Sequence, residues 1–177
     1  MELPKKISEE VVYNNKYRKV IKKKFQIKNW NIHDFMITWQ SWTKIWTMVM
    51  PITKDWTIIY EKEYRYWTEE IIYNFPIWVL EEHLEEVENV KKELQEETWY
   101  NSNEIEYLWK TIAWNYDDWT IKYYIARNCE AWTQDLEDSE YIEVIEESIE
   151  EFEKSVKSWK INCPLTLSCW ALWKDRI

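Results

Sequence analysis

The chain has 177 residues, a formal net charge of −10 at pH 7 and three cysteines. This length predicts one domain with a substantial core, and the acidity argues against a nucleic-acid backbone as the main partner. The cysteines lack metal-site spacing and indicate reduced thiols. No stretch approaches the length of a membrane span and the N-terminus has no apolar signal segment, so we expect a cytoplasmic protein without a membrane partner.

The sequence has no glycine but 15 tryptophans, whereas average usage supplies glycine at about 7%, roughly a dozen residues. Many tryptophans stand where glycine is usual. Trp30, Trp56 and Trp119 follow Asn or Asp between β-rich runs, as in Asn-Gly and Asp-Gly hairpins. Trp99 and Trp159 follow helical stretches, at the left-handed position that commonly ends a helix. We hypothesise that most were glycine in the natural protein, from UGA codons read as tryptophan; the alternative is an unusual tryptophan-rich protein.

The first part of the chain is rich in β-forming residues. Residues 11–38 contain the runs VVY, KYRKVIKKKFQI and IHDFMI. We assign residues 1–40 to an N-terminal β segment and residues 41–177 to the main domain. The lysines at 22–24 are expected on the solvent side of a strand. Residues 44–51 and 57–65 predict two strands joined by the turn TKDW.

Residues 76–100 predict a loop followed by an amphipathic helix around which the main domain is built. The apolar residues expected to face a core are Leu84, Val87, Val90 and Leu94. Three glutamates, Glu93, Glu96 and Glu97, bring their carboxylates together on one side of the last turns. Such like charges repel unless a cation lies among them, and oxygen ligands suit a hard ion such as magnesium. The alternative is a solvated helix face.

The rest of the chain continues the alternation of strands and helices. Residues 103–114 and 120–131 predict two further strands, and an acidic loop follows at 133–147. Residues 147–158 and 164–177 predict two helices, whose apolar stripes are expected to pack in the core.

The segment KELQEETWY, residues 92–100, resembles the second half of the Nudix box, G-x5-E-x7-R-E-U-x-E-E-x-G-U, where U is apolar. Glu93, Glu96 and Glu97 match the metal-binding glutamates of that family. The chain departs from the box at four places: both glycines are replaced, by Trp78 and Trp99, the first glutamate by Leu84, and the arginine by Lys92. Lysine lacks the planar fork of arginine and should brace the helix less firmly.

Three other segments resemble the ADP-ribose pyrophosphatases of the Nudix superfamily: the 44–65 hairpin, FPIW at 75–78 against WEFPAG, and 133–147 against QDLDEDEFIEV. The resemblance implies that Arg65 contacts substrate and that the Ile77 carbonyl is a magnesium ligand. It implies Glu140 as the catalytic base, with Glu137 as second choice. Asn74 replaces a common glutamate, so one substrate or metal contact is in doubt.

As a whole, the resemblance implies an α/β fold, the Nudix-type α/β/α sandwich with a mixed β-sheet, in which the N-terminal β segment helps to build a homodimer. It implies hydrolysis of ADP-ribose or a similar nucleoside diphosphate sugar to AMP and ribose 5-phosphate, with Mg²⁺, or alternatively Mn²⁺, as cofactor and Glu96 also taking part in catalysis. Two alternatives remain open: hydrolysis of another nucleoside diphosphate derivative, and a Nudix-like sensor that binds nucleotide without cleaving it.

Overall fold

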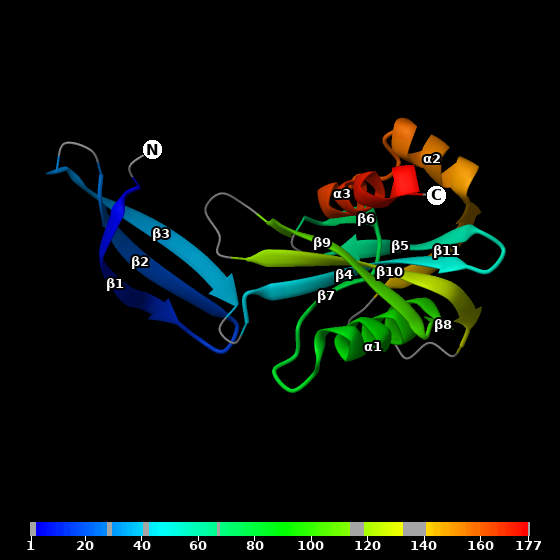
Figure 1. Ribbon diagram of the computed structural model, residues 1–177, viewed down its shortest axis with the longest axis horizontal. Helices are drawn as coiled ribbons and strands as arrows, with labels where there is room; N and C mark the ends of the chain where they lie inside the picture. The colour runs from blue at the N-terminus through cyan, green and yellow to red at the C-terminus, as the bar shows by residue number, and fades with distance from the viewer. Residues whose placement is uncertain are drawn as a thin grey trace. The chain divides into compact units, whose positions relative to one another are not determined.

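The structure is a computed structural model, and it describes residues 3–27, 30–40, 43–66, 68–113, 119–132 and 141–176 (Figure 1). Its contacts divide the chain into two compact units. One contains residues 1–45 and 111–120, and the other contains residues 46–110 and 121–177. Among the described residues, no helix has the length and apolar character needed to cross a membrane.

The N-terminal unit contains an antiparallel sheet in the order β1-β2-β3, with strands at Lys5–Asn14, Arg18–Gln26 and Ile32–Gln40. These strands confirm the predicted β-rich runs. In the pairing of β1 with β2, Glu9 lies opposite Lys23 and Glu10 opposite Lys22. The Lys22 ammonium also lies 2.9 Å from a carboxylate oxygen of Asp34 on β3. The lysine run therefore lies on a strand, as expected, but its side chains are half-buried rather than fully on the solvent side, and Lys22 makes cross-strand charge pairs.

The second unit is built on a sheet in the order β11-β5-β4-β10-β8, with β6 paired to β5, β7 to β4 and β9 to β10. The strands are β4 (Ile45–Thr53), β5 (Thr57–Arg65), β6 (Glu70–Asn74), β7 (Ile77–Val79), β8 (Tyr100–Asn101), β9 (Glu104–Ile112), β10 (Thr120–Ala131) and β11 (Ile142–Ser148). The predicted hairpin of β4 and β5 and the predicted strands β9 and β10 are confirmed.

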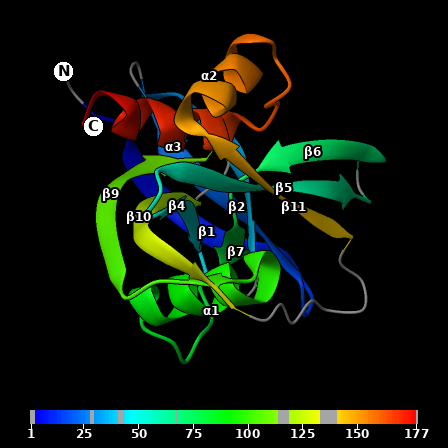
Figure 2. The ribbon, with the colours of Figure 1, turned by 90° about the vertical axis from the view of Figure 1, so that its right-hand side faces the viewer.

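Helices cover both faces of this sheet: α1 (Glu86–Thr98) one face, and α2 (Ile149–Lys157) and α3 (Pro164–Trp173) the other (Figure 2). A turn of 3-10 helix, Lys174–Arg176, follows α3. Neighbouring residues of β5 point to opposite faces, as strand geometry requires. Ile59 packs in the cluster with Val90 and Leu94 of α1, whereas Tyr60 meets Phe152 of α2 edge-on. The sheet therefore separates two apolar layers.

The apolar stripe predicted for α1 is only half right. Val90 and Leu94 are buried, but Val87 is 42% exposed and Leu84 precedes the helix. A buried polar residue, Asn89, takes part of the inward face. Its side chain donates to Thr47 Oγ1 on β4 at 3.1 Å and accepts from the Glu81 backbone N–H at 3.1 Å. The inward face of α1 is thus shared between apolar and hydrogen-bonded residues.

The first turn of α1 is tied to β10. The Glu86 carboxylate accepts hydrogen bonds from Lys122 and from the Tyr124 hydroxyl, the latter at 2.6 Å. Burial raises the pKa of the Glu86 carboxyl, but these two donors lower the pKa by more, so that it lies below its ordinary value. The ionised carboxylate therefore holds the start of the helix on the sheet.

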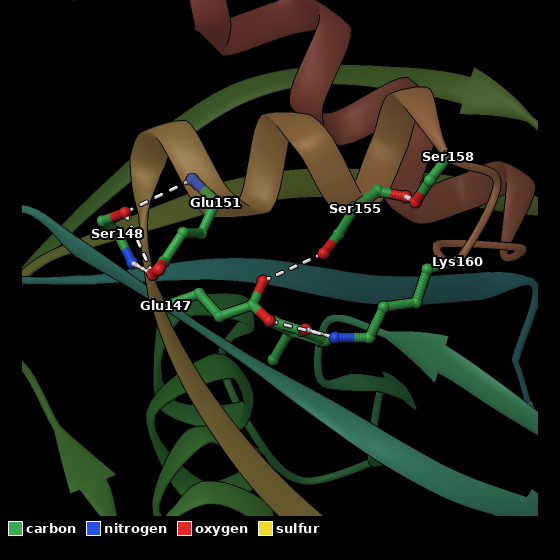
Figure 3. Close-up of polar contacts among 7 residues, drawn as sticks. Glu147, Ser148, Glu151, Ser155, Ser158 and Lys160 are labelled. Carbon is green, nitrogen blue, oxygen red and sulfur yellow. Dashed lines mark hydrogen bonds and ion pairs between the residues drawn. The ribbon is translucent and has the colours of Figure 1, made fainter.

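The start of α2 is fixed by a capping box (Figure 3). The Ser148 hydroxyl accepts from the Glu151 backbone N–H at 3.3 Å, and the Glu151 carboxylate accepts from the Ser148 backbone N–H at 3.3 Å. Beside it, the Glu147 carboxylate accepts from Lys160 at 2.9 Å and from Ser155 at 3.1 Å. These contacts anchor α2 to β11 and explain why the helix begins at Ile149, two residues after the predicted start.

Four tryptophans have left-handed backbone: φ is 64° at Trp30, 61° at Trp56, 70° at Trp99 and 64° at Trp159. The left-handed backbone expected at Trp99 and Trp159 is confirmed, and Trp30 and Trp56, which were expected at glycine positions of turns, have it too. Trp56 closes the turn between β4 and β5, with its N–H donating to the Thr53 carbonyl at 3.2 Å. Residues 114–118, which precede Trp119, lie outside the described residues, so the turn predicted there stays a prediction.

Candidate functional site

The carboxylates of α1 are unusually well covered. Glu93 and Glu97 are each 5% exposed, although they lie one turn apart in the same helix. The side chain of Glu96, between them in sequence, is 33% exposed. Burial of two carboxylates in one stretch of helix is costly unless positive charge or hydrogen-bond donors are supplied. The structure therefore excludes a fully solvated helix face for Glu93 and Glu97.

Lys92 supplies positive charge to this group. Its ammonium nitrogen lies 2.6 Å from Glu81 Oε1, 3.2 Å from Glu96 Oε2 and 4.0 Å from Glu93 Oε1. Burial lowers the pKa of Lys92, but the hydrogen bond with Glu81 and the charges of Glu93 and Glu96 raise the pKa by more, and the net shift is upward. Lys92 thus bridges the loop before α1 to the acidic side of the helix.

The chemistry of these donors suits a hard divalent cation. In the part of the chain that the structure describes, no group of three His, Cys, Asp or Glu side chains is arranged to hold a metal ion. Magnesium does not require such a cage, because it commonly binds through one or two carboxylates, waters and the phosphates of a substrate. Buried carboxylates on α1 fit that mode of binding.

Glu61 is a buried carboxylate that sequence reasoning missed. It is 1% exposed and lies on β5 two residues after Ile59, so strand alternation places it on the face covered by α1. Asn74 of β6 donates to Glu61 Oε2 at 3.0 Å and to the Phe75 carbonyl at 3.1 Å. An acidic residue at an inward position of an otherwise apolar run was the available signal.

Arg65 ends β5, and a guanidinium nitrogen lies 2.7 Å from Glu63 Oε2. The two side chains are 20% and 14% exposed, so this pair is more covered than an ion pair on the open surface. Ile77 opens β7 opposite Met48 of β4 and is 7% exposed. Whether the Ile77 carbonyl binds metal stays a prediction.

An open cavity of about 380 Å³ lies beside the end of β5, where β6 and β11 flank it. The Tyr64 ring meets Tyr66 edge-on with centroids 5.4 Å apart, and Lys62 forms an ion pair with Glu143 at 2.6 Å. The residues that line the cavity are Lys62, Glu63, Tyr64, Ile71, Tyr141, Ile142 and Glu143. Sequence reasoning missed this aromatic opening because its walls come from three strands.

The two candidate bases, Glu137 and Glu140, lie outside the described residues. Tyr141 follows them directly, and its carbonyl accepts from the Tyr64 backbone N–H at 3.2 Å. The described chain thus resumes beside the strand that carries Arg65, next to the cavity.

Comparison with solved structures shows what fold the chain has. The chain is similar to the crystal structure of an ADP compounds hydrolase, with a TM-score of 0.84 and 18% sequence identity over 99% of this chain and 94% of that chain. No protein-family model and no curated protein sequence matches. The similarity confirms the expected fold, an α/β Nudix-type sandwich with a mixed sheet.

Proposed function

We propose that the chain hydrolyses the pyrophosphate bond of ADP-ribose or a similar nucleoside diphosphate sugar, giving AMP and ribose 5-phosphate with Mg²⁺ as cofactor. The proposal is carried mainly by the burial of Glu93 and Glu97 on a helix whose outer carboxylate, Glu96, already neighbours a cation, Lys92. The similar fold of an ADP compounds hydrolase supports the same class of substrate.

In this proposal Glu93, Glu96 and Glu97 hold Mg²⁺, or alternatively Mn²⁺, together with the carbonyl of Ile77. A divalent ion bound there would neutralise charge on the pyrophosphate and make a bound water more acidic.

Arg65 positions the nucleotide end. Its guanidinium has five donors, so contact with Glu63 leaves donors for a phosphate. The role of base falls to Glu140, because the reaction needs a carboxylate that can take a proton from the attacking water.

Product analysis after incubation with ADP-ribose and Mg²⁺ tests the proposal. It is run on the chain with its tryptophans and on a variant with glycine at Trp30, Trp56, Trp99 and Trp159. We expect AMP and ribose 5-phosphate, with loss of turnover in Glu97→Gln. The matched control is Glu88→Gln, an exposed glutamate on the same helix, which should retain turnover. Equal turnover in Glu97→Gln and Glu88→Gln would refute the role of the helix.

Two rival functions give different results in the same assay. A well-folded chain that cleaves another nucleoside diphosphate derivative, but not ADP-ribose, has the same chemistry with a different substrate. Binding of ADP-ribose in calorimetry without product in the presence of Mg²⁺ would indicate a sensor. The sensor is favoured by Leu84, Lys92 and Asn74, three of the positions at which the chain departs from the residues of the family that it resembles.

We also propose that the active form is a homodimer in which the N-terminal β segment takes part. Every residue of β1 is exposed in the single chain, including the apolar Ile7, Val11 and Val12. An exposed edge strand with apolar side chains is suited to pairing with another strand. Sedimentation equilibrium should give twice the mass of one chain, and removal of residues 1–14 should reduce it to one. A monomer at micromolar concentration would contradict this assignment.

A further inference from the structure

The left-handed tryptophans occupy positions for which the residue type is a poor choice. Four of the six non-glycine residues with positive φ in the described part of the chain are tryptophans. At these angles the Cβ of an L-residue crowds the backbone, whereas glycine adopts them without cost and Asn or Asp tolerates them best among the others. Tryptophan combines this crowding with the largest side chain, and the chain contains no glycine at all.

The indole rings at these positions are largely exposed and bury little apolar surface. Trp30 is 84% exposed and Trp159 82% exposed, and Trp56 and Trp99 are about half exposed at 52% and 49%. The chain also contains a tryptophan of the opposite kind: Trp173 is 0% exposed, lies in α3 and packs against a neighbouring indole. Packing therefore accounts for the tryptophan in α3, but not for those in the turns.

At Trp99 and Trp159 the backbone makes the hydrogen bonds of a helix end at which glycine is the usual residue. After α1, the Trp99 N–H donates to the Gln95 carbonyl at 3.4 Å. After α2, the Trp159 N–H donates to the Val156 carbonyl and the Ile161 N–H to the Ser155 carbonyl, both at 3.2 Å. Helix ends of this kind use the left-handed residue only through its backbone. The structural requirement at each position is met by glycine.

We propose that residues 30, 56, 99 and 159 are glycine in the protein as its source makes it, each decoded from a UGA codon that the source reads as glycine. The proposal explains both the missing glycine and the position of the exposed tryptophans at left-handed turns. It also separates two classes of tryptophan. Trp173, which is buried in regular helix, belongs to the class that is tryptophan in the natural protein.

The coding DNA and the native protein together test this proposal. We expect TGA at the codons for residues 30, 56, 99 and 159 and TGG at the codon for residue 173, which serves as the internal control. Peptides from the protein purified from its source should have masses that match glycine at the four positions. TGG codons at these positions would overturn the proposal, and so would TGA codons together with tryptophan masses. Neither result depends on what the protein hydrolyses.

Discussion

Replacement of Trp159 by glycine and by alanine isolates the cost of its left-handed backbone. Both variants lose the same indole ring, which is 82% exposed, so its small buried part cancels between them. Relief of crowding at φ 64° favours glycine by about 1–2 kcal/mol, and the greater freedom of glycine in the unfolded chain offsets about 0.4–1 kcal/mol of this. We therefore expect Trp159→Gly to be more stable than Trp159→Ala by roughly 1 kcal/mol.

Urea unfolding followed by circular dichroism measures the difference. In thermal unfolding of a chain of this length, the same difference of about 1 kcal/mol corresponds to about 2–4 °C in Tm. The control is the same pair of substitutions at Trp109, which is 59% exposed but lies within strand β9. There the order should reverse, because glycine in a regular strand is less stable than alanine by about 0.5–1 kcal/mol. If alanine equals or exceeds glycine at position 159, the argument from backbone strain is wrong.

Three further predictions concern single contacts. The pKa of the Glu86 carboxyl is lowered by its partner Lys122. The stability that this carboxylate contributes is therefore complete above the ordinary pKa of about 4.5, and it is lost as the pH falls through the lowered pKa. Glu86→Gln should flatten the acid limb of a curve of stability against pH, and an unchanged limb would contradict this. Asn74→Leu removes the donor to buried Glu61 and should cost about 1–3 kcal/mol in urea unfolding; a loss below the error of the measurement would show that the contact is unimportant. An aromatic disulfide reagent at pH 8 should titrate one thiol in the native chain, that of the partly exposed Cys163, and three thiols after denaturation. The other two cysteines are buried and the pKa values of their thiols are raised, so they should not react in the native chain. Rapid reaction of all three thiols in the native chain would contradict their burial.

The features predicted correctly from the sequence are those with local causes. Strand β5 follows a turn that contains Asp55 and Trp56, and α1 is followed by Trp99, where the left-handed residue was expected. Turn chemistry and helix termination depend on a few neighbouring residues, so they are visible in a short stretch of sequence.

The failures have causes that are distant in sequence. The apolar stripe predicted for α1 did not include Asn89, which is buried on the inward face and whose partner Thr47 is 42 residues away. Glu61 became a site residue only through pairing of β5 with β6, which brings Asn74 beside it. Helical periodicity identifies a face but not the element that packs on it. A cavity such as the one at the end of β5 is lined by residues from three strands, so no single segment of sequence indicates it.

The charge pairs between β1 and β2 affect the register in which the two strands pair more than the strength of their pairing. In the observed register, Ser8 lies opposite Lys24, with Glu9 and Glu10 opposite the two preceding lysines. If β1 slid by two residues, so that Lys6 took the place of Ser8, it would face Lys24 and two like charges would meet. A two-residue slip keeps each side chain on its own face, so hydrophobic patterning does not oppose it. In this direction charge repulsion opposes the slip, and because salt screens exposed charges, this protection weakens as ionic strength rises.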